Sequence, residues 1–383
     1  MYYRRLGNTG LRVSEIGFGT IPILQGSVPV LPEYFNLDDQ TAIAVLEYAF
    51  SLGCNLFDTA IVPEYGDAEI KLGKFAKHIG RECIVISDKA RFFTGNEMYQ
   101  GVLDSCANLG TFADIYFVHQ VDRAHEDEVF QKGGALDALT ELKREGRIRF
   151  AGIASHYYDI LLRGAQDRRV DVLQGSGNIF ERGMLERIKT EPLFQEKGIL
   201  VNKVYAAGLL PAFFKENILI QGVLSYPISC ALIGLGSIAQ VKTAMDWDTR
   251  AQLAAIPSFE DVLMILEKHY LPIPCDRCQR CKCLYKEAIA ADMDKQMFME
   301  SEASVIETEI HTLFRQYQYF YMGKDYWALK KLGLGIAQSA AQCRRCTQMP
   351  CLELCPQKIR IPDEIQRIAE LVEDRKSTRL NTR

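Results

Sequence analysis

Eight short apolar runs, separated by segments with helical periodicity, occupy residues 16 to 240 of this 383-residue chain. Several runs are almost continuously apolar, which is typical of parallel strands that are covered on both faces. The segment Asp39–Leu52 is an example of an intervening helix, with Asn36 or Asp38 available as its cap. The runs expected to form strands are Ile16–Thr20, Asn55–Ala60, Ile84–Ala90, Asp114–Gln120, Ile148–Ser155, Val170–Gly175, Gly198–Tyr205 and Ala231–Gly236.

Eight consecutive β/α units favour an α/β fold in the form of a closed (β/α)8 TIM barrel. An open, doubly wound sheet is the alternative. No Gly-x-Gly-x-x-Gly follows the first run, which argues against a Rossmann dinucleotide site. Before the first unit, Tyr2–Leu6 and Val13–Ile16 flank a Gly/Asn turn and predict a hairpin that closes the bottom of the barrel.

The rest of the chain predicts a second, smaller and mainly helical module. We expect the barrel over residues 1–271, this module over residues 272–375 and a disordered polar tail over residues 376–383. One helix is expected at Phe259–Tyr270 and another within Glu300–Lys331, whose aromatic side chains predict a face that packs the module onto the barrel. The prolines that mark the junction are Pro257, Pro272 and Pro274.

The composition is that of a globular protein, with 48% hydrophobic and 25% charged residues. A net charge of -4 offers no electrostatic reason to expect binding to nucleic acid or to an anionic membrane. No apolar stretch approaches the ~18 residues of a membrane span. The first residues lack the apolar core of a signal peptide, so we expect a cytoplasmic protein.

Four side chains capable of proton chemistry lie at or just past the ends of successive runs, where parallel α/β proteins place their active sites. They are Asp58, Tyr65, Lys89 and His119. A tyrosine with a reference pKa of about 10 becomes a usable acid when a lysine stabilises its phenolate and a carboxylate holds that lysine. A histidine can orient a carbonyl oxygen.

Each of the four has an ordinary structural explanation when taken alone. Asp58 could cap a helix, Tyr65 could be a loop aromatic, Lys89 a solvated strand end and His119 a hydrogen-bonded core histidine. Four such coincidences at consecutive strand ends are less plausible than one site. Together the residues predict an enzyme that protonates a carbonyl oxygen while a nicotinamide delivers hydride.

These residues lie in motifs that resemble those of the aldo-keto reductase family over roughly residues 1–250. The resemblance implies a (β/α)8 barrel that binds NADPH and reduces a small aldehyde or ketone, with Asp58, Tyr65, Lys89 and His119 as catalytic tetrad and Tyr65 as general acid. The motifs are Arg5-Leu-Gly-Asn-Thr-Gly-Leu-Arg-Val-Ser14, Gly17-Phe-Gly-Thr20, Phe57-Asp-Thr-Ala60, Tyr65-Gly-Asp-Ala-Glu69, Leu72-Gly73, the strand ending in Lys89, and Asp114-Ile-Tyr-Phe-Val-His119.

The same resemblance implies a set of residues that bind the cofactor. Ser155 and Gln174 are expected at the nicotinamide carboxamide, and the loop Gly234–Ser237 with Gln240 beside the phosphates. Lys203 matches a lysine that some members carry on the seventh strand. The full set is Gly19, Thr20, Asp58, Ser155, Gln174, Lys203, Gly234, Gly236, Ser237 and Gln240.

The chain departs from the family pattern at three points. Four residues, Ile61–Glu64, precede Tyr65 where the family has two, which would displace Tyr65 unless the loop bulges outward. His156 stands where an asparagine is common. The last loop has no basic residue for a 2′-phosphate, although Lys242 and Arg250 are near, so NADH stays open beside NADPH.

Eight of the twelve cysteines lie between Cys275 and Cys355, in two sets with short spacings. The second set ends in Cys-x3-Cys-Pro, which is the bacterial ferredoxin ending for a [4Fe–4S] cluster. Two structural zinc sites are the alternative, because Cys-x2-Cys pairs also suit tetrahedral Zn²⁺. The sets are Cys275, Cys278, Cys281 and Cys283, and Cys343, Cys346, Cys351 and Cys355.

The segment after Cys355 is similar to the ferredoxin tail of a subgroup of the aldo-keto reductases, which implies a ferredoxin-like module. In two-cluster ferredoxins the fourth cysteine of each set ligates the other cluster. Cys355 would then join Cys275, Cys278 and Cys281. Cys283 would join the second set, but its spacing is unusual, so one cluster is the alternative to two.

A nicotinamide gives up two electrons as hydride, whereas a [4Fe–4S] cluster accepts one, and no flavin motif is present to couple them. We therefore expect clusters that are structural or that serve a separate electron-transfer protein. The alternative function is an electron-transfer or regulatory iron–sulfur protein with a catalytically weak, cofactor-binding barrel. A third hypothesis is a non-redox interaction protein whose barrel senses the cofactor.

Overall fold

The computed structural model divides the chain into two compact units. The first comprises Met1–Ile179 and Met184–Asp261, and the second comprises Phe180–Gly183 and Val262–Arg383. The residues that the structure describes are 1–25, 36–212, 214–245, 259, 261, 262, 264, 273, 275, 277, 278, 280, 281, 310–323, 336, 339–341 and 343–380.

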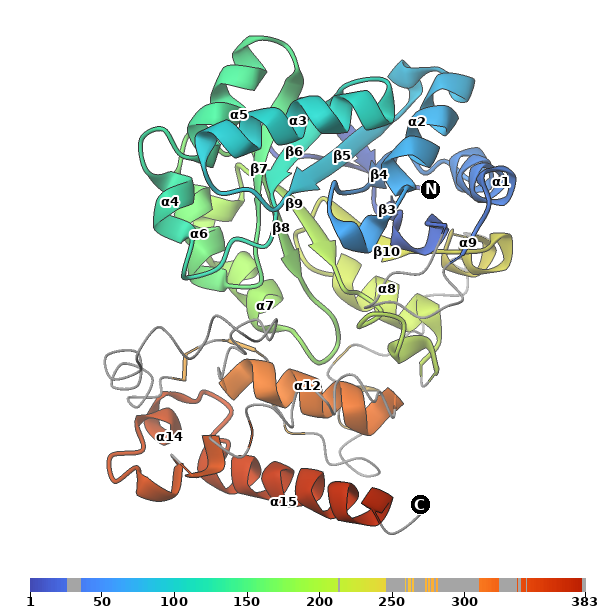
Figure 1. The fold of residues 1–383 in the computed structure, drawn as a ribbon. Coiled ribbons are helices and arrows are strands. Elements are labelled where there is room, and N and C mark those ends of the chain that lie inside the picture. Colours follow the sequence, from blue (N-terminus) through green and yellow to red (C-terminus); the bar gives the residue numbers. More distant parts are fainter. Residues whose placement is uncertain are drawn as a thin grey trace. The chain divides into compact units, whose positions relative to one another are not determined.

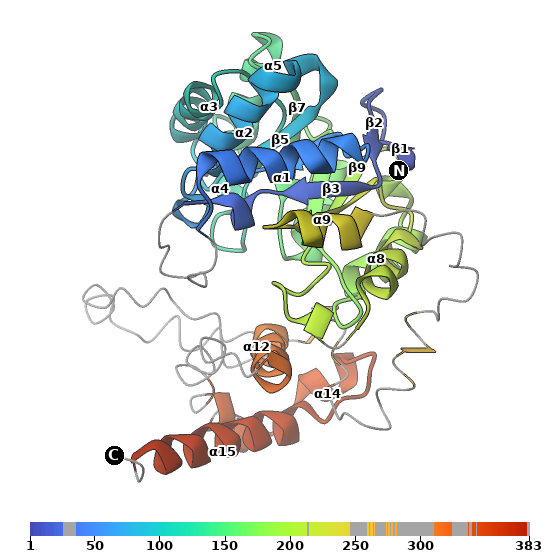
Figure 2. The same cartoon turned by 90° about the vertical axis from the view of Figure 1, so that its right-hand side faces the viewer.

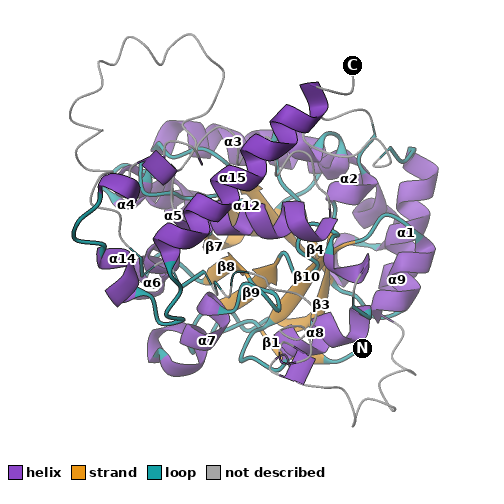
Figure 3. Cartoon of the chain, turned by 90° about the horizontal axis from the view of Figure 1, so that it is seen from below, coloured by secondary structure: helices purple, strands orange, loops and turns teal. Residues whose placement is uncertain are grey.

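The first unit is a closed barrel of parallel strands in the order β10-β3-β4-β5-β6-β7-β8-β9 (Figure 3). Each predicted run overlaps one strand, and β6, β8 and β10 each extend one residue beyond their runs. The (β/α)8 prediction is confirmed, and the alternative of an open sheet was wrong. In the register of neighbouring strands, Asp58 pairs with Ser87. The strands are β3 (Ile16–Gly19), β4 (Leu56–Asp58), β5 (Val85–Ala90), β6 (Ala113–Val118), β7 (Ile148–Ala154), β8 (Val172–Ser176), β9 (Gly198–Asn202) and β10 (Cys230–Gly234).

Helices surround the strands as an outer layer (Figure 1). Of the two predicted caps, Asp38 begins the first helix, since its Oδ1 accepts from the Thr41 N–H at 2.7 Å. The helices are α1 (Asp39–Ser51), α2 (Ala68–Ile79), α3 (Gly95–Leu109), α4 (Glu126–Phe130), α5 (Ala135–Arg144), α6 (Tyr158–Gln166), α7 (Gly183–Thr190), α8 (Glu216–Leu224) and α9 (Ile238–Met245). Short 3-10 turns lie at Ile21–Ile23, Pro63–Tyr65, Arg81–Cys83, Pro192–Phe194 and Leu210–Ala212.

The predicted hairpin is formed by β1 (Tyr3–Arg5) and β2 (Arg12–Ser14), beside the start of β3 (Figure 2). Leu6 and Val13 are buried in one apolar cluster with side chains of the barrel strands, so the hairpin closes this end of the barrel. Gly7 has φ +51°, and a Cβ there would lie 2.3 Å from the backbone nitrogen of Gly198. Glycine is therefore required at this approach.

The second unit is helical in its described part, with α12 (Ile310–Gly323), α14 (Pro350–Leu354) and α15 (Ile361–Leu380). One buried apolar cluster joins α12 to α15, and the Arg367 guanidinium donates to the Tyr317 hydroxyl at 2.9 Å. Tyr317 and Phe320 are buried, which confirms that these two aromatic residues pack. That the aromatic face docks on the barrel remains a prediction, and a ferredoxin-like fold is not shown.

Two predicted boundaries differ from the structure. The units divide at residue 261 rather than 271, and Phe180–Gly183 belongs to the second unit. The last helix continues to Leu380, so residues 376–380 are helical where a disordered tail was predicted. Buried apolar residues anchor this helix earlier in its length, and the following Lys and Arg residues have good helix propensity. No helix among the described residues has the length and hydropathy that a membrane span requires.

Candidate functional site

A buried ion pair lies at the carboxyl ends of β4 and β5. The Lys89 ammonium donates to Asp58 Oδ2 and to the Thr59 carbonyl, both at 2.6 Å. The other carboxylate oxygen, Oδ1, accepts from the Ser87 hydroxyl at 2.7 Å and from the Gln174 amide at 2.9 Å. Because both oxygens of Asp58 are engaged, the carboxylate is fixed and holds the ammonium in place. The Gln174 contact with Asp58 has no signal in the sequence.

The longer link before Tyr65 bulges outward and leaves the tyrosine inside. Pro63 is exposed, whereas Tyr65 is buried at the end of a 3-10 turn. The Ile61 N–H donates to the Lys89 carbonyl at 3.0 Å, which ties the link to β5. The Lys89 ammonium lies 5.2 Å from the centre of the Tyr65 ring. Tyr65 therefore lies beside Lys89 despite the longer link.

Both groups keep their protons at neutral pH. Burial raises the pKa of Tyr65 to about 12, although the positive charge of Lys89 acts in the opposite direction. Burial lowers the pKa of Lys89, but the negative charge of Asp58 raises it, and the net shift is upward. The pair therefore presents a protonated phenol beside a charged ammonium. The expectation that Lys89 makes Tyr65 a stronger acid is not met in this structure, because burial outweighs the charge of Lys89.

His119 follows β6 and presents a buried, neutral imidazole. Its backbone N–H donates to the Ala90 carbonyl at 2.8 Å. Burial lowers the pKa of the ring well below its usual range, and nearby positive charges, Lys89 first, lower it further. A neutral ring can donate a hydrogen bond to a substrate oxygen without carrying charge. The other side chains that act on it in this way are Arg91, His156 and Lys203.

Buried polar atoms that have no hydrogen-bond partner gather at the carboxyl ends of the barrel strands. Native proteins leave few such atoms, so a group of them indicates a place for a polar ligand. The residues at this end therefore fit a bound cofactor and substrate. Among the described residues, the unpartnered atoms here are Thr20 Oγ1, Thr59 Oγ1, Glu64 Oε2, Arg91 Nε, His119 Nδ1, Asn202 Oδ1 and the Tyr205 hydroxyl.

The structure brings some of the predicted cofactor residues together. Gly19 and Gly234 are partners in the register of β3 and β10, and Thr20 follows directly. In the loop before α9, the Gly236 N–H donates to Gln240 Oε1 at 2.7 Å. The Gln240 N–H donates to the Ser237 hydroxyl at 3.2 Å, so this loop caps the helix.

Two other predicted cofactor residues, Ser155 and Lys203, form hydrogen bonds with nearby loop residues. The Ser155 hydroxyl donates to the Val121 carbonyl at 2.6 Å. Lys203 lies just past β9 with φ +60°, and its carbonyl accepts from the Asn178 amide at 3.0 Å. Arg250 lies outside the described residues, whereas Lys242 is exposed on α9.

Known proteins match the barrel. The model of the aldo/keto reductase family matches residues 15–217. The chain belongs to the aldo/keto reductase family. Among relatives, it is 33% identical to L-galactose dehydrogenase of Arabidopsis thaliana over 168 residues, which is 41% of this chain and 49% of that protein. It is 28% identical to the NADH-specific methylglyoxal reductase of Escherichia coli over 222 residues, which is 52% of this chain and 65% of that protein.

A solved structure of a provisionally assigned aldo-keto reductase from Pseudomonas aeruginosa superposes with a TM-score of 0.56 at 27% identity. The superposition covers 65% of this chain and 95% of the solved one. The sequence matches to L-galactose dehydrogenase and to the methylglyoxal reductase span 49% and 65% of those proteins. The residues matched by the aldo/keto reductase model end at 217, before the cysteines of the second unit.

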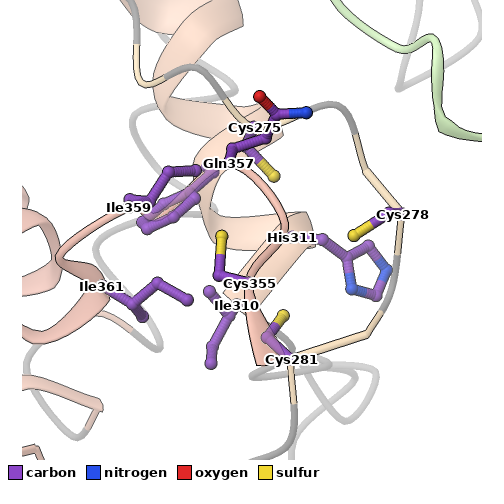
Figure 4. A pocket seen from close by; sticks show the side chains of 10 residues that line it. Cys275, Cys278, Cys281, Ile310, His311, Cys355, Gln357, Ile359 and Ile361 are labelled. Carbon is purple, nitrogen blue, oxygen red and sulfur yellow. The ribbon is translucent and has the colours of Figure 1, made fainter. Parts of the chain in front are cut away.

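Four cysteines of the second unit line one pocket, and their sulfur atoms point into the same space (Figure 4). They are Cys275, Cys278, Cys281 and Cys355. The same four cysteines were expected together from the ligand pattern of two-cluster ferredoxins. Burial raises the pKa of Cys281 to about 12, and the charge of Cys278 adds to the shift. In the described part of the chain, no three His, Cys, Asp or Glu side chains are grouped closely enough for a single metal ion.

The other expected group of ligands is Cys343, Cys346 and Cys351 with Cys283, and it is described only in part, because Cys283 lies outside the described residues. The Cys346 N–H donates to the Cys343 carbonyl at 3.2 Å, and the Met349 N–H donates to the Cys346 sulfur at 3.4 Å. Cys351 is buried in α14. Cys351 belongs to the apolar cluster that joins α12 to α15, and Cys343 packs against that cluster.

Sequence reasoning missed two features of the cysteine pocket. His311 of α12 is buried and lines the pocket with the cysteines. The carboxylate of Glu181 contacts Arg277, which lies between Cys275 and Cys278. No local pattern could have found either contact, because His311 is far in the chain from the cysteines and Glu181 is far from Arg277.

Proposed function

We propose that this chain is an NAD(P)H-dependent oxidoreductase that reduces a small aldehyde or ketone, with Tyr65 as general acid. The observation that carries the proposal is the Lys89 ammonium, held at 2.6 Å by Asp58 and 5.2 Å from the centre of the Tyr65 ring. The family to which the chain belongs supports the reaction class.

The protein's own residues would supply the proton and the electrostatic support. When bound, the nicotinamide supplies a hydride to the carbonyl carbon. The Tyr65 hydroxyl transfers its proton to the carbonyl oxygen, so hydride and proton together give the alcohol. The Lys89 ammonium stabilises the phenolate that remains, and Asp58 keeps the ammonium charged and in position. The neutral His119 ring orients the oxygen.

The cofactor would be held by residues around the carboxyl ends of the strands. Ser155 and Gln174 would hold the carboxamide, and the capped loop before α9 would lie beside the phosphates. Gly19, Thr20, Asp58 and Lys203 complete the set. One relative is named as NADH-specific, and Lys242 is the described basic residue on α9. We therefore propose NADPH with NADH as the alternative, to be separated by parallel binding titrations.

Changing Tyr65 to Phe tests the reductase. Loss of the general acid should lower kcat by about 10²–10⁴-fold while NAD(P)H binding is unchanged. The measurement is steady-state carbonyl reduction together with cofactor fluorescence titration. Tyr99→Phe is the control, because the Tyr99 hydroxyl contacts Glu145 on the exposed surface. Undiminished turnover in Tyr65→Phe would remove Tyr65 from this role.

We also propose that Cys275, Cys278, Cys281 and Cys355 bind a [4Fe–4S] cluster. The pocket that these four cysteines share supports this proposal. Such a cluster transfers single electrons, so we propose a structural role or a separate electron-transfer protein as partner. Cysteines that serve as ligands are compatible with a reducing, cytoplasmic setting. Cys343, Cys346 and Cys351 with Cys283 would form a second site.

An anaerobic absorbance spectrum with iron, sulfide and zinc analysis tests the cluster. A broad band near ~400 nm with about four irons per chain indicates one cluster, and about eight indicates two. A colourless protein that contains zinc would replace the clusters with structural zinc. Rapid bleaching of the band by NADPH alone would contradict separate electron pathways.

A further inference from the structure

A buried carboxylate of the second unit binds two arginines. Glu181 Oε2 lies 2.7 Å from the Arg277 guanidinium, and Glu181 Oε1 lies 3.1 Å from that of Arg315. The three side chains are 3%, 6% and 14% exposed, in the order Glu181, Arg277 and Arg315. An ion triad this deeply buried is costly to desolvate, and removal of its central charge leaves two buried cations without that partner.

Each arginine belongs to an element that lines the cysteine pocket. Arg277 lies between Cys275 and Cys278 and has φ +58°, a left-handed conformation that is uncommon for a residue with a side chain. Arg315 lies on α12, one turn after His311 and directly after Phe314, and both of these line the pocket. Glu181 therefore joins the cysteine loop and α12 through one side chain.

We propose that Glu181 is a positioning residue of the cysteine site, which it holds in its binding geometry through Arg277 and Arg315. This inference rests on the proposed iron–sulfur function of that pocket. The left-handed turn at Arg277 is held from outside the turn, by the contact of its guanidinium with Glu181. Outer residues that orient metal ligands commonly change metal affinity by ~10–100-fold when they are altered.

Glu181 comes from a segment of the chain far before the cysteines. Glu181 lies in Phe180–Gly183, between β8 and α7, whereas the cysteines follow residue 262. The second unit is therefore not one continuous C-terminal segment. The cysteine site depends on a residue supplied from within the barrel sequence, and the full chain is the proper object of the test.

The charges of the triad predict opposite effects on the reduction of a cluster. Reduction adds one negative charge to the cluster, and net charge nearby is one of the factors that set cluster potentials. Glu181→Gln removes a negative charge and should raise the midpoint potential. Arg277→Gln removes a positive charge and should lower it. General destabilisation of the fold would not produce shifts of opposite sign.

The experiment uses the full holoprotein and compares Glu181→Gln and Arg277→Gln with the unaltered protein. The control is Glu141→Gln, because Glu141 pairs with Arg144 on the exposed face of α5. Iron release to a chelator and the midpoint potential, from dithionite titration followed by electron paramagnetic resonance, are measured. We expect release from Glu181→Gln to be ~10–100-fold faster, with an unchanged control. Equal release rates, or potentials that do not move in opposite directions, would overturn the inference.

Two further results separate the outcomes. If Glu181→Gln retains no iron, Glu181→Asp restores the charge, and recovery of iron supports the inference whereas none overturns it. If the unaltered protein itself contains zinc, or lacks iron and sulfide, the proposed cluster fails independently of Glu181. Circular dichroism of each variant checks that the barrel remains folded.

Discussion

At the scale of single residues, two buried carboxyl groups lie close to the candidate active site. Asp88 Oδ1 accepts from the Lys89 N–H at 2.8 Å, and Glu69 Oε2 accepts from the Asn108 amide at 2.8 Å. Their other oxygens have no partner among the described residues. Burial, and then the charge of Glu69, raise the pKa of Asp88 well above its usual range. Asp88 therefore binds a proton more tightly in the folded protein than in the unfolded chain.

This raised pKa predicts that Asp88→Asn stabilises the protein at high pH. The unfolded carboxyl titrates near ~3.9, so the folded state binds the extra proton and stability falls as pH rises toward the folded pKa. Asparagine keeps the acceptor for the Lys89 N–H and offers Glu69 an amide donor. The melting temperature should exceed that of the parent by a few degrees at pH 8 and by less at pH 5.

The control for this prediction is Asp104→Asn, because Asp104 is exposed on α3. An equal difference at both pH values would contradict the raised pKa of Asp88. The charge of Asp88 also acts on other titratable groups, which therefore contribute to the pH dependence of the melting temperature. These groups are Lys89, Tyr65, Cys106 and Tyr116.

At the scale of elements, the link between β4 and α2 depends on an ion pair. Arg91, just past β5, lies 3.2 Å from Glu64, the residue before Tyr65. The two side chains are 37% and 30% exposed, so the pair should contribute only ~0–1 kcal/mol to stability. Because Glu64 directly precedes Tyr65, we expect the pair to act on the placement of Tyr65.

Arg91→Gln and Glu64→Gln should therefore lower kcat with little loss of stability. A misplacement of ~1 Å can cost ~10²-fold in rate, so we expect a loss of ~10–100-fold for either variant. The measurement is kcat together with the melting temperature. The control is Arg163→Gln, which removes an exposed pair with Asp127. A loss confined to Arg91→Gln would indicate a direct role of Arg91 instead.

A buried lysine ties α2 to the chain around β3. The Lys71 ammonium donates to the carbonyls of Ile23 and Leu37 at 2.9 and 2.6 Å, and to Asp67 at 3.1 Å. Lys71→Met leaves the buried Ile23 carbonyl and two partly buried acceptors without their donor, and should cost about 3 kcal/mol in free energy of unfolding. Denaturant titration measures this cost. Lys74→Met, on the same helix but with the exposed partner Asp39, should cost less than about 1 kcal/mol.

At the scale of the whole molecule, Cys355 approaches cysteines from a distant part of the chain. Since it shares the pocket of Cys278, Cys355→Ala and Cys278→Ala should abolish the same resonance signal and about four irons per chain. Cys83→Ala is the control, because Cys83 is an exposed thiol of the barrel. Two variants that abolish different signals would show that the pocket does not correspond to one cluster.

The candidate site could be predicted from the sequence where its signals are local. Alternation of strand and helix patterns indicated the barrel, and parallel strands bring their carboxyl ends to one side, so Asp58 and Lys89 were expected close together. The contact of Gln174 with Asp58 could not be predicted, because β4 and β8 meet only across the closed barrel.

The sequence by itself determined the eight strands and the order in which polar residues end them, because short-range periodicity encodes both. Tertiary structure alone decided the rest. The bulge that keeps Tyr65 beside Lys89, the raised pKa of Asp88, and the contact of Glu181 with Arg277 all depend on burial and on packing between residues distant in the chain. Local sequence carries no record of which distant side chains will share a buried space.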